Sequence, residues 1–499
     1  MAQVYPHLHI VLLADDFGEE LWPLARKQAP ACLVPADSGA SDSLLSAAVA
    51  RTRPFTSYPL HVVTTAELAD SIYGELSTFC GLSERDIDPI IVPARHGSAF
   101  SVALACACIR HADPDAVVMV VPANQKMELD DRWGNIVFSA YQVALRDRIV
   151  LFGAQQEQRS AGVSYIRHGG QFENIEGTYE VRLFVSDARL SQAQRAIRDG
   201  AFWYTGMYMA RAASVLGAFS AAADAGENGG FGVERIAETA SFLALLDRGA
   251  WRTEDAQSII AALPRESIEK AVLEPSGRLV ALPVTAQVMQ VSSLADLDNA
   301  APADAAGNRG FGTTVQVESS NVTAFEQEPG RLVCTAGIEG AVVVDTADAV
   351  LVASKSMLRD MEPVFAALAR AQVPQAAGSV RRPYPWGTAE LLFSAPGCAA
   401  WRLELRAGSR LEAFTVPAAY GCPAAPEPDP DSDGGDAPAP VLREQYAVAG
   451  GHVSICGRRA GAQALSMDAG DAFEADADDP LFIVAADVPA TLVLTAALG

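Results

Sequence analysis

Residues 9–26, HIVLLADDFGEELWPLAR, join an apolar run to a turn that carries four carboxylates. The run from Ile10 to Ala14 is typical of a parallel strand buried on both faces, and the residues after it read as a turn and the start of a helix. In α/β proteins such a corner receives phosphate, because glycine-rich backbone brings N–H groups close to the phosphate oxygens. Gly18 suits that role, but the acidic side chains oppose it, since two like charges about 4 Å apart repel by roughly 1 kcal/mol in water and by several times more near a protein surface. These side chains are Asp15, Asp16, Glu19 and Glu20.

The piece LWPLAR, residues 21–26, resembles the signature of the sugar nucleotidyltransferases, above all of bacterial mannose-1-phosphate guanylyltransferases fused to a mannose-6-phosphate isomerase domain. In that family the strand is followed by Gly-Gly-x-Gly-Thr-Arg-Leu-Trp-Pro-Leu-Ser-Arg and then by Pro-Lys-Gln-Phe. The matching positions are Gly18, Leu21, Trp22, Pro23, Leu24, Arg26 and Pro30. The family's leading glycines, Thr-Arg pair and lysine are replaced here by Asp15 and Asp16, by Glu19 and Glu20, and by Ala31.

Further segments resemble the same family in the same order along nearly the whole chain. VPARHGSA keeps the family's arginine as Arg95, and the stretch after LFGA keeps Gly162. FWYTGMYMARA keeps Trp203 and Gly206, and SIEKAVLE has Glu269 for the family's aspartate. Other matching segments are VMVVPANQ, RLFVSDA, AQVMQVSSLADL, VVVDTADAVLVA and RPYPWGTAELL.

Nucleotidyl transfer needs a cation near the α-phosphate, a divalent metal held by carboxylates and an aligned sugar phosphate. The resemblance implies Mg²⁺ as cofactor, but places Asn124 and Gln290 at the two metal-binding Asp positions and Asp187 at the sugar-phosphate Lys position. Hard divalent cations select charged oxygens, so the sequence predicts an impaired metal site, and no metal ligands are assigned.

Arg26 and Lys27 are the candidate catalytic cations that remain. Arg26 and Arg95 either contact phosphate or form structural ion pairs, which are common on acidic chains. Lys27 could replace the lost lysine, although it lies about one helical turn earlier. The aromatic and glycine positions either line a sugar or base pocket or serve packing and turns. The candidate nucleotide- and sugar-binding residues are Gly18, Trp22, Arg95, Asn124, Gly162, Trp203, Gly206 and Glu269.

Composition limits the partners and the compartment. The net charge of −24 argues against nucleic-acid binding, which depends on Lys and Arg neutralising phosphates. The sequence has no apolar stretch of membrane-spanning length and no signal-peptide pattern at its N-terminus, so a cytoplasmic protein without membrane contact is expected. Eight scattered cysteines without a C-x-x-C pair predict buried thiols rather than disulfides or zinc.

At 499 residues the chain should form two or three domains. Strands alternating with helical stretches predict an α/β, doubly wound, Rossmann-like nucleotidyltransferase domain over residues 1–295. The resemblance implies a short β-helical connector over 308–355, followed by a helix (SMLRDMEPVFAALARA) and a degenerate cupin-like β-barrel over 378–499. The acidic, Pro-rich insert 423–440 is predicted to be disordered.

The isomerase half lacks the residues for its metal. Cupin sites of this family use several histidines, but His452 is the only one after residue 378. His452 is therefore read as a surface or capping residue, and isomerase activity is not expected.

These features predict a mannose-1-phosphate guanylyltransferase-like protein that is weakly active or inactive. The family reaction converts GTP and mannose 1-phosphate to GDP-mannose and pyrophosphate. Its ligand would be GTP or a nucleotide sugar, and the chain could form a homo-oligomer. The alternative is a non-catalytic regulatory or scaffold partner that forms a hetero-oligomer with an active paralogue, by analogy with other nucleotide-sugar pyrophosphorylases.

Overall fold

A computed structural model describes most of the chain, and its contacts divide the chain into two units. The first comprises residues 1–69, 82–344 and 351–364, and the second comprises residues 70–81, 345–350 and 365–499. The structure describes residues 3–26, 29–35, 43–93, 96–155, 163–173, 175–225, 230–246, 251, 254–298, 302–328, 330–376, 378–395, 398–413, 442–457, 464–475, 481–485 and 488–498.

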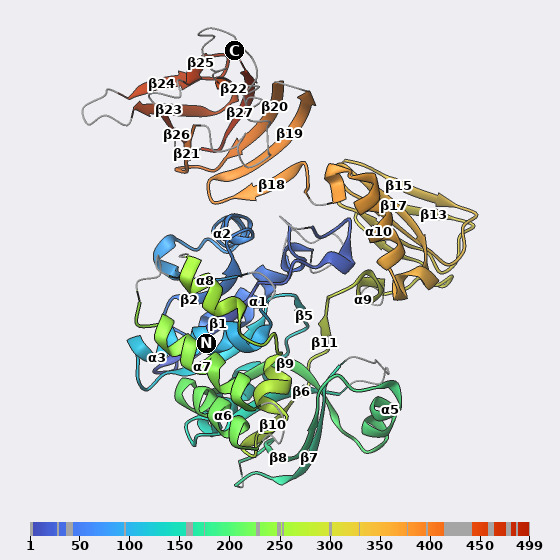
Figure 1. Cartoon of the computed structure of the whole chain (residues 1–499). Coiled ribbons are helices and arrows are strands. Elements are labelled where there is room, and N and C mark those ends of the chain that lie inside the picture. The colour runs from blue at the N-terminus through green and yellow to red at the C-terminus, as the bar shows by residue number, and fades with distance from the viewer. Residues whose placement is uncertain are drawn as a thin grey trace, which may run out of the picture. The chain divides into compact units, whose positions relative to one another are not determined.

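A nine-stranded mixed sheet forms the centre of the first unit (Figure 1). Its β1, β2, β3 and β4 are parallel neighbours, and β9 pairs antiparallel with both β4 and β6. The predicted alternation of strands with helices is confirmed, for example by β2, β4 and β6 and the helices between them. In spatial order the strands are β3 (Ile87–Val92), β2 (Leu60–Thr65), β1 (Leu8–Leu13), β4 (Val117–Pro122), β9 (Phe202–Arg211), β6 (Ile149–Ala154), β10 (Leu279–Val284), β8 (Tyr179–Val185) and β7 (Tyr165–Gln171).

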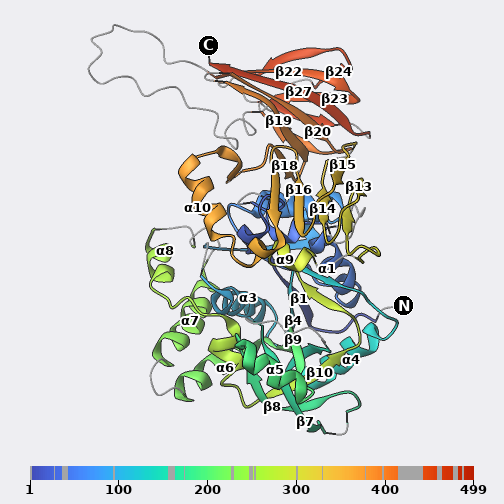
Figure 2. The ribbon, with the colours of Figure 1, turned by 90° about the vertical axis from the view of Figure 1, so that its right-hand side faces the viewer.

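Helices cover both faces of this sheet, as the α/β prediction requires. On one face α3, α6 and α7 pack together, and Phe100 and Phe219 join Val11 and Val118 in one core (Figure 2). On the other face the Trp133 ring of α4 lies 5.9 Å from the Phe152 ring of β6. The helices of this unit are α1 (Leu44–Thr52), α3 (Ser98–Ala112), α4 (Trp133–Ala144), α5 (Leu190–Arg198), α6 (Ala212–Ala225), α7 (Gly230–Leu243), α8 (Glu254–Ala261) and α9 (Leu294–Asp298).

The predicted helix start after β1 is wrong. Only a 3-10 turn, Glu19–Leu21, follows the strand, and the first α-helix begins at Leu44. Pro23 and Pro30 interrupt the segment, because proline lacks an N–H and disfavours helical backbone in the residue before it. The signature segment is therefore a long irregular loop.

A short parallel β-helical region follows the α/β part. Two sheets form it: β12 (Arg309–Phe311), β14 (Thr323–Glu326), β16 (Ala341–Asp345) and β17 (Val350–Ser354) in one, and β13 (Thr314–Val317) with β15 (Val333–Ala336) in the other. The Phe311 and Phe325 rings stack 4.3 Å apart between successive turns. The helix predicted next begins later than expected, as α10 (Glu362–Ala371), after a 3-10 turn over Lys355–Arg359.

The second unit is a two-sheet β structure with helix α2 (Ala69–Thr78). Trp401 and Tyr446 are buried in its core, which fits the predicted cupin-like barrel. The predicted insert 423–440 lies outside the described residues. One sheet has β18 (Arg381–Tyr384), β19 (Gly387–Ala395), β20 (Cys398–Leu405), β27 (Ala490–Leu498), β22 (Leu442–Gly450) and β25 (Ala472–Ala475), and the other has β21 (Arg410–Glu412), β26 (Leu481–Ala485), β23 (His452–Gly457) and β24 (Leu465–Asp468).

Two sequence-based expectations concern membrane spans and cysteines. Among the described residues, none of the helices has the length and apolarity to cross a membrane. None of the seven described cysteines forms a disulfide, and Cys32 and Cys106 are buried as predicted. Cys334 is an exception, because it is exposed on the outer face of β15. Cys422 lies outside the described part.

Candidate functional site

The corner after β1 is held by its own acidic side chains. The Asp16 carboxylate accepts the Gly18 N–H at 3.0 Å, and the Asp15 carboxylate accepts the Ser101 hydroxyl of α3 at 2.7 Å. Burial raises the pKa of Asp15, with Asp16 adding repulsion, although the Ser101 bond lowers it in part. The carboxylates thus occupy the corner where phosphate oxygens would lie.

Gly18 is required here by packing. Its φ of +67° lies in the left-handed region, and a Cβ at this position would lie 2.6 Å from the Cβ of Ala31. Ala31 itself has no exposed surface. Of the two readings of Gly18, this contact supports the tight turn.

The signature residues Trp22 and Arg26 lie inside the fold. Trp22 is 8% exposed and Arg26 is 3% exposed. The Arg26 Nε donates to the Pro23 carbonyl at 3.2 Å. These observations favour core packing over a sugar or base pocket for Trp22, and a structural contact over a phosphate contact for Arg26.

The two positions that hold metal ligands in the family meet in a small ribbon. Strand β5 (Gln125–Met127) pairs antiparallel with β11 (Val288–Gln290), and Gln290 lies opposite Gln125. The neighbouring Asn124 donates its amide N–H to the Val291 carbonyl at 3.2 Å, and its amide nitrogen lies 3.5 Å from an Asp16 oxygen. The fold therefore brings positions 124 and 290 together, but with neutral amides.

These donors do not fit a tightly bound Mg²⁺. Asn124 directs its N–H group toward the nearby carboxylate, whereas Mg²⁺ requires oxygen ligands and favours charged ones. Across the described part of the chain there is no group of three or more His, Cys, Asp or Glu side chains that could hold a metal.

Arg51 supports the ribbon, although no sequence motif signals this role. Arg51 is buried, with 2% of its surface exposed. Its guanidinium donates hydrogen bonds to the backbone carbonyls of Gln125 at 3.0 Å and Pro122 at 3.2 Å. Burial lowers the pKa of Arg51 to about 10. A charged helix residue that bonds carbonyls can be recognised once the tertiary structure is known.

A cavity of about 280 Å³ opens beside the ribbon. Trp203, Tyr204 and Gly206 of β9 line it, and so do residues 265–267, Glu269 and Lys270. Three predicted site residues, Trp203, Gly206 and Glu269, therefore reach the cavity, and Gln290 lines it as well. The remaining lining residues are Val163, Ser164 and Asp187.

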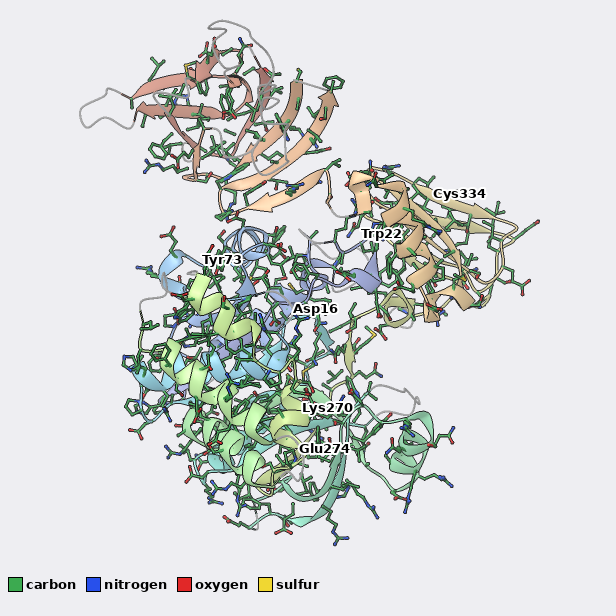
Figure 3. All side chains as sticks on the ribbon, in the orientation of Figure 1. Asp16, Trp22, Tyr73, Lys270, Glu274 and Cys334 are labelled. Atoms are coloured by element: carbon green, nitrogen blue, oxygen red, sulfur yellow. The ribbon has the colours of Figure 1, made fainter. Side chains whose placement is uncertain are left out.

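Two of the residues that line this cavity, Lys270 and Asp187, form an ion pair. The Lys270 ammonium lies 2.6 Å from the Asp187 carboxylate, and both side chains are at least half exposed. The Asp187 hydrogen bond and charge raise the pKa of Lys270. Figure 3 labels Lys270, which lies within the π-helical turn Glu269–Leu273, and Glu274, which follows that turn.

Glu269 lies beside two buried tyrosines. Burial raises the pKa of Glu269, and Asp187 adds to the shift. Burial also raises the pKa values of Tyr204 and Tyr208, with the Glu269 charge contributing to both. Within the described structure neither phenol hydroxyl has a hydrogen-bond partner. The cavity wall therefore favours neutral forms of these acids.

Comparisons with known proteins agree on one family. Residues 312–368 match the family model described as "MannoseP isomerase/GMP-like beta-helix domain". Xanthan biosynthesis protein XanB of Xanthomonas campestris pv. campestris (strain B100) is 26% identical over 416 residues, which is 82% of this chain and 83% of XanB. A mannose-1-phosphate guanylyltransferase of Klebsiella pneumoniae is 24% identical over 80% of this chain and 82% of its own length.

The chain is a relative of the bacterial mannose-1-phosphate guanylyltransferases. A crystal structure described as mannose-1-phosphate geranyltransferase from Thermus thermophilus has the same fold, with a TM-score of 0.61 at 20% identity. The match covers 74% of this chain and all of that one.

Against this guanylyltransferase pattern, Lys270 is a second residue, besides Arg51, that sequence reasoning missed. The family's lysine position holds Asp187, and the family's tyrosine after the aspartate holds Lys270. The two replacements contact each other in space, so the cavity has a cation at Lys270 in place of the lost lysine. A compensating pair of this kind could have been sought among neighbours of the replaced motif positions.

Three predicted site residues and the isomerase site remain. Lys27, Arg95 and Gly162 lie outside the described residues. His452 is a surface residue as predicted, with its Nδ1 2.7 Å from the Asp468 carboxylate and its Nε2 2.7 Å from the Ser466 hydroxyl.

Proposed function

We propose that this chain binds a nucleoside diphosphate sugar of the GDP-mannose type in the cavity lined by Trp203, Tyr204 and Gly206 of β9. We propose further that it transfers nucleotide weakly or not at all. The meeting of Asn124 and Gln290 at the β5–β11 ribbon carries the proposal. The relatives named mannose-1-phosphate guanylyltransferase support the ligand class. The amides support impaired catalysis, because neutral ligands leave the metal without the carboxylates that neutralise its charge.

The cavity supports ligand binding for a second reason. It combines aromatic surface from Trp203 with the cations Lys270 and Arg265 and with polar backbone, a mixture typical of small-molecule sites. In the proposal, Lys270 contacts a phosphate of the ligand after leaving Asp187. Glu269 would accept sugar hydroxyls.

Calorimetry and a pyrophosphate assay on the full chain test the proposal. We expect GDP-mannose to bind with measurable heat and without a magnesium requirement, while GTP and mannose 1-phosphate release pyrophosphate far more slowly than the roughly 1–10³ s⁻¹ typical of enzymes. Magnesium-dependent release in that range would refute the impaired site. An absence of heat with GDP-mannose, GTP and mannose 1-phosphate would refute the binding proposal and favour the non-catalytic partner.

Substitutions of Lys270 and of its ion-pair partner Asp187 are expected to change the affinity for GDP-mannose in opposite directions. Lys270→Gln is expected to weaken GDP-mannose binding by about fivefold, because an exposed charged contact contributes little more than that. Asp187→Asn is expected to strengthen binding by a similar factor, since it frees the ammonium. Both are measured by calorimetry at low and high salt, and equal effects in the same direction would contradict the assignment.

The partner alternative has its own test. This chain would be co-expressed with an active paralogous guanylyltransferase, and size-exclusion chromatography would reveal a complex that contains both proteins. A change in that enzyme's rate on adding this chain would favour a regulatory role.

A further inference from the structure

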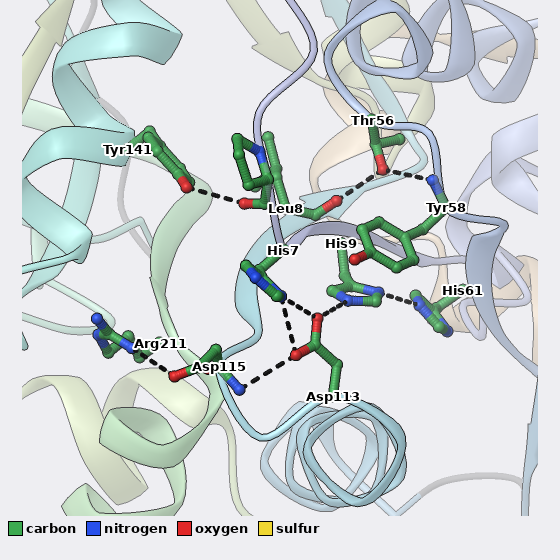
Figure 4. Close-up of polar contacts among 11 residues, drawn as sticks. His7, Leu8, His9, Thr56, Tyr58, His61, Asp113, Asp115, Tyr141 and Arg211 are labelled. Atoms are coloured by element: carbon green, nitrogen blue, oxygen red, sulfur yellow. Dashed lines mark hydrogen bonds and ion pairs between the residues drawn. The ribbon is translucent and has the colours of Figure 1, made fainter.

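Three histidines and two carboxylates form a continuous hydrogen-bonded chain at the end of the sheet where the parallel strands begin. Figure 4 shows its members His7, His9, His61 and Asp113. His9 lies near the start of β1, His61 near the start of β2, and Asp88 near the start of β3. Asp113 follows the last residue of α3. The phosphate corner lies after the opposite end of β1, so this cluster is separate from the candidate site.

The distances define the order of the chain. His61 Nδ1 lies 2.7 Å from Asp88 Oδ2, and His61 Nε2 lies 3.0 Å from His9 Nδ1. His9 Nε2 lies 3.1 Å from Asp113 Oδ2. His7 Nδ1 lies 2.8 Å from the same Asp113 oxygen.

Burial excludes water from the centre of this chain. The side chains of His9 and His61 are 5% and 9% exposed, whereas His7 at the outer end is 47% exposed. A buried nitrogen without a hydrogen bond costs free energy, so each ring nitrogen needs a donor–acceptor match.

The match fixes the number of protons. Each carboxylate accepts, so His61 carries a proton on Nδ1 and His9 carries one on Nε2. The two nitrogens that face each other then require one proton between them, because two lone pairs or two N–H groups at 3.0 Å would repel. Three protons on four nitrogens give the pair a single positive charge between two negative carboxylates.

We propose that the His9–His61 pair is a buried proton-binding site that links the starts of β1, β2 and β3 to the end of α3 through hydrogen bonds, and that this link weakens when the pair takes up a fourth proton. The fourth proton places N–H groups on both facing nitrogens and breaks the hydrogen bond between the rings. The link between the strands and α3 is therefore sensitive to acid.

The surrounding charges agree with this assignment. The Asp115 backbone N–H donates to Asp113 at 3.1 Å, while the Asp115 side chain lies 3.7 Å from Arg211. The Tyr58 ring lies 4.0 Å from the His9 ring. Burial opposes charge on Asp113, but the bonds from His7 and His9 bring its pKa below the usual range.

The direction of the pH effect follows from His9. Burial lowers the pKa of His9, and the Asp113 hydrogen bond offsets part of that shift. In the unfolded chain an ordinary histidine takes up its proton near about pH 6.5. The folded pair holds three protons, whereas the two unfolded histidines hold two well above about pH 6.5 and four well below it. The stability that the pair contributes is therefore greatest near about pH 6.5 and falls as the pH falls below that value.

Urea unfolding of the full chain at pH 7.5, 6.5 and 5.5 tests the proposal. His9→Gln is expected to flatten the pH dependence by up to about tenfold in the unfolding constant per pH unit, the effect of one proton. His111→Gln, at an exposed position on the last turn of α3, is the matched control and should keep the original slope. Equal slopes in the two variants would overturn the proposal.

Nitrogen-15 NMR of histidine-labelled, unmodified protein tests the proton count even if His9→Gln does not fold. At pH 7.5 we expect three protonated nitrogens in the His9–His61 pair, identified by their loss in His61→Gln. Two neutral rings, or two fully charged rings, would overturn the assignment.

Discussion

The double variant Asn124→Asp/Gln290→Asp is expected to acquire a magnesium response that the natural chain lacks. The new carboxylate at position 124 would face Asp16, and the one at position 290 would lie on the partner strand of the ribbon, where the mutual repulsion of these charges lowers stability until a divalent cation neutralises it. We expect magnesium to raise the melting temperature of the variant and pyrophosphate release to increase by roughly 10²-fold, the order of effect of restored electrostatic stabilisation. Differential scanning fluorimetry with a magnesium titration measures the first response.

The control for this variant is Asn124→Ser/Gln290→Ala, which removes the same amides without adding charge. It should lose the Asn124–Val291 hydrogen bond but gain no magnesium response. A melting temperature that magnesium does not move in the Asp variant would contradict the assignment of positions 124 and 290 as the former clamp.

If magnesium binds but release stays slow, a missing cation is the remaining cause. Lysine at position 31 is a poor remedy, since Ala31 has no exposed surface and packs against Gly18. Glu20 is exposed, and the family has arginine at this position. Adding Glu20→Arg to the double variant is therefore the change expected to raise release further.

Gly18→Ala is expected to destabilise the first unit by about 3 kcal/mol. The left-handed backbone costs about 1 kcal/mol for a residue with a Cβ, and the forced contact with Ala31 adds about 2 kcal/mol of overpacking. Urea unfolding measures the change.

Gly200→Ala separates the two contributions to this loss. Gly200 has a φ of +72°, similar to that of Gly18, but a Cβ there meets nothing within 4 Å. We expect a loss of about 1 kcal/mol from backbone strain alone. A Gly18 variant no less stable than the Gly200 variant would show that the Ala31 contact is relieved at little cost.

Local chemistry explains which parts of the fold were predictable. The buried strands β1, β4 and β6 contain continuous apolar runs, and such runs have few alternatives to a covered sheet. The prediction of a helix after β1 was wrong, because Pro23 and Pro30 disfavour helical backbone even in a segment that matches the family signature. The prediction of a buried thiol was wrong for Cys334. Side chains alternate between the two faces of a strand, and this alternation places Cys334 on the exposed face of β15.

The candidate site was predictable only in part. Motif spacing led to Trp203, Gly206 and Gln290, all of which line the cavity. The same reasoning placed Trp22 and Arg26 in the site, although burial gives them structural contacts. Arg51 was missed, because its partners are backbone carbonyls that no side-chain pattern reveals.

The sequence by itself determined the kind of protein and the replaced charges, since strand composition and motif residues are properties of the chain read in order. The tertiary structure alone decided which replacements meet. Asp187 and Lys270 form an ion pair, and His9 joins His61 and Asp113, because neighbouring strands and loops bring together residues that are distant along the chain. Hydrogen bonds and ion pairs act over a few ångströms, so their existence depends on the folded packing.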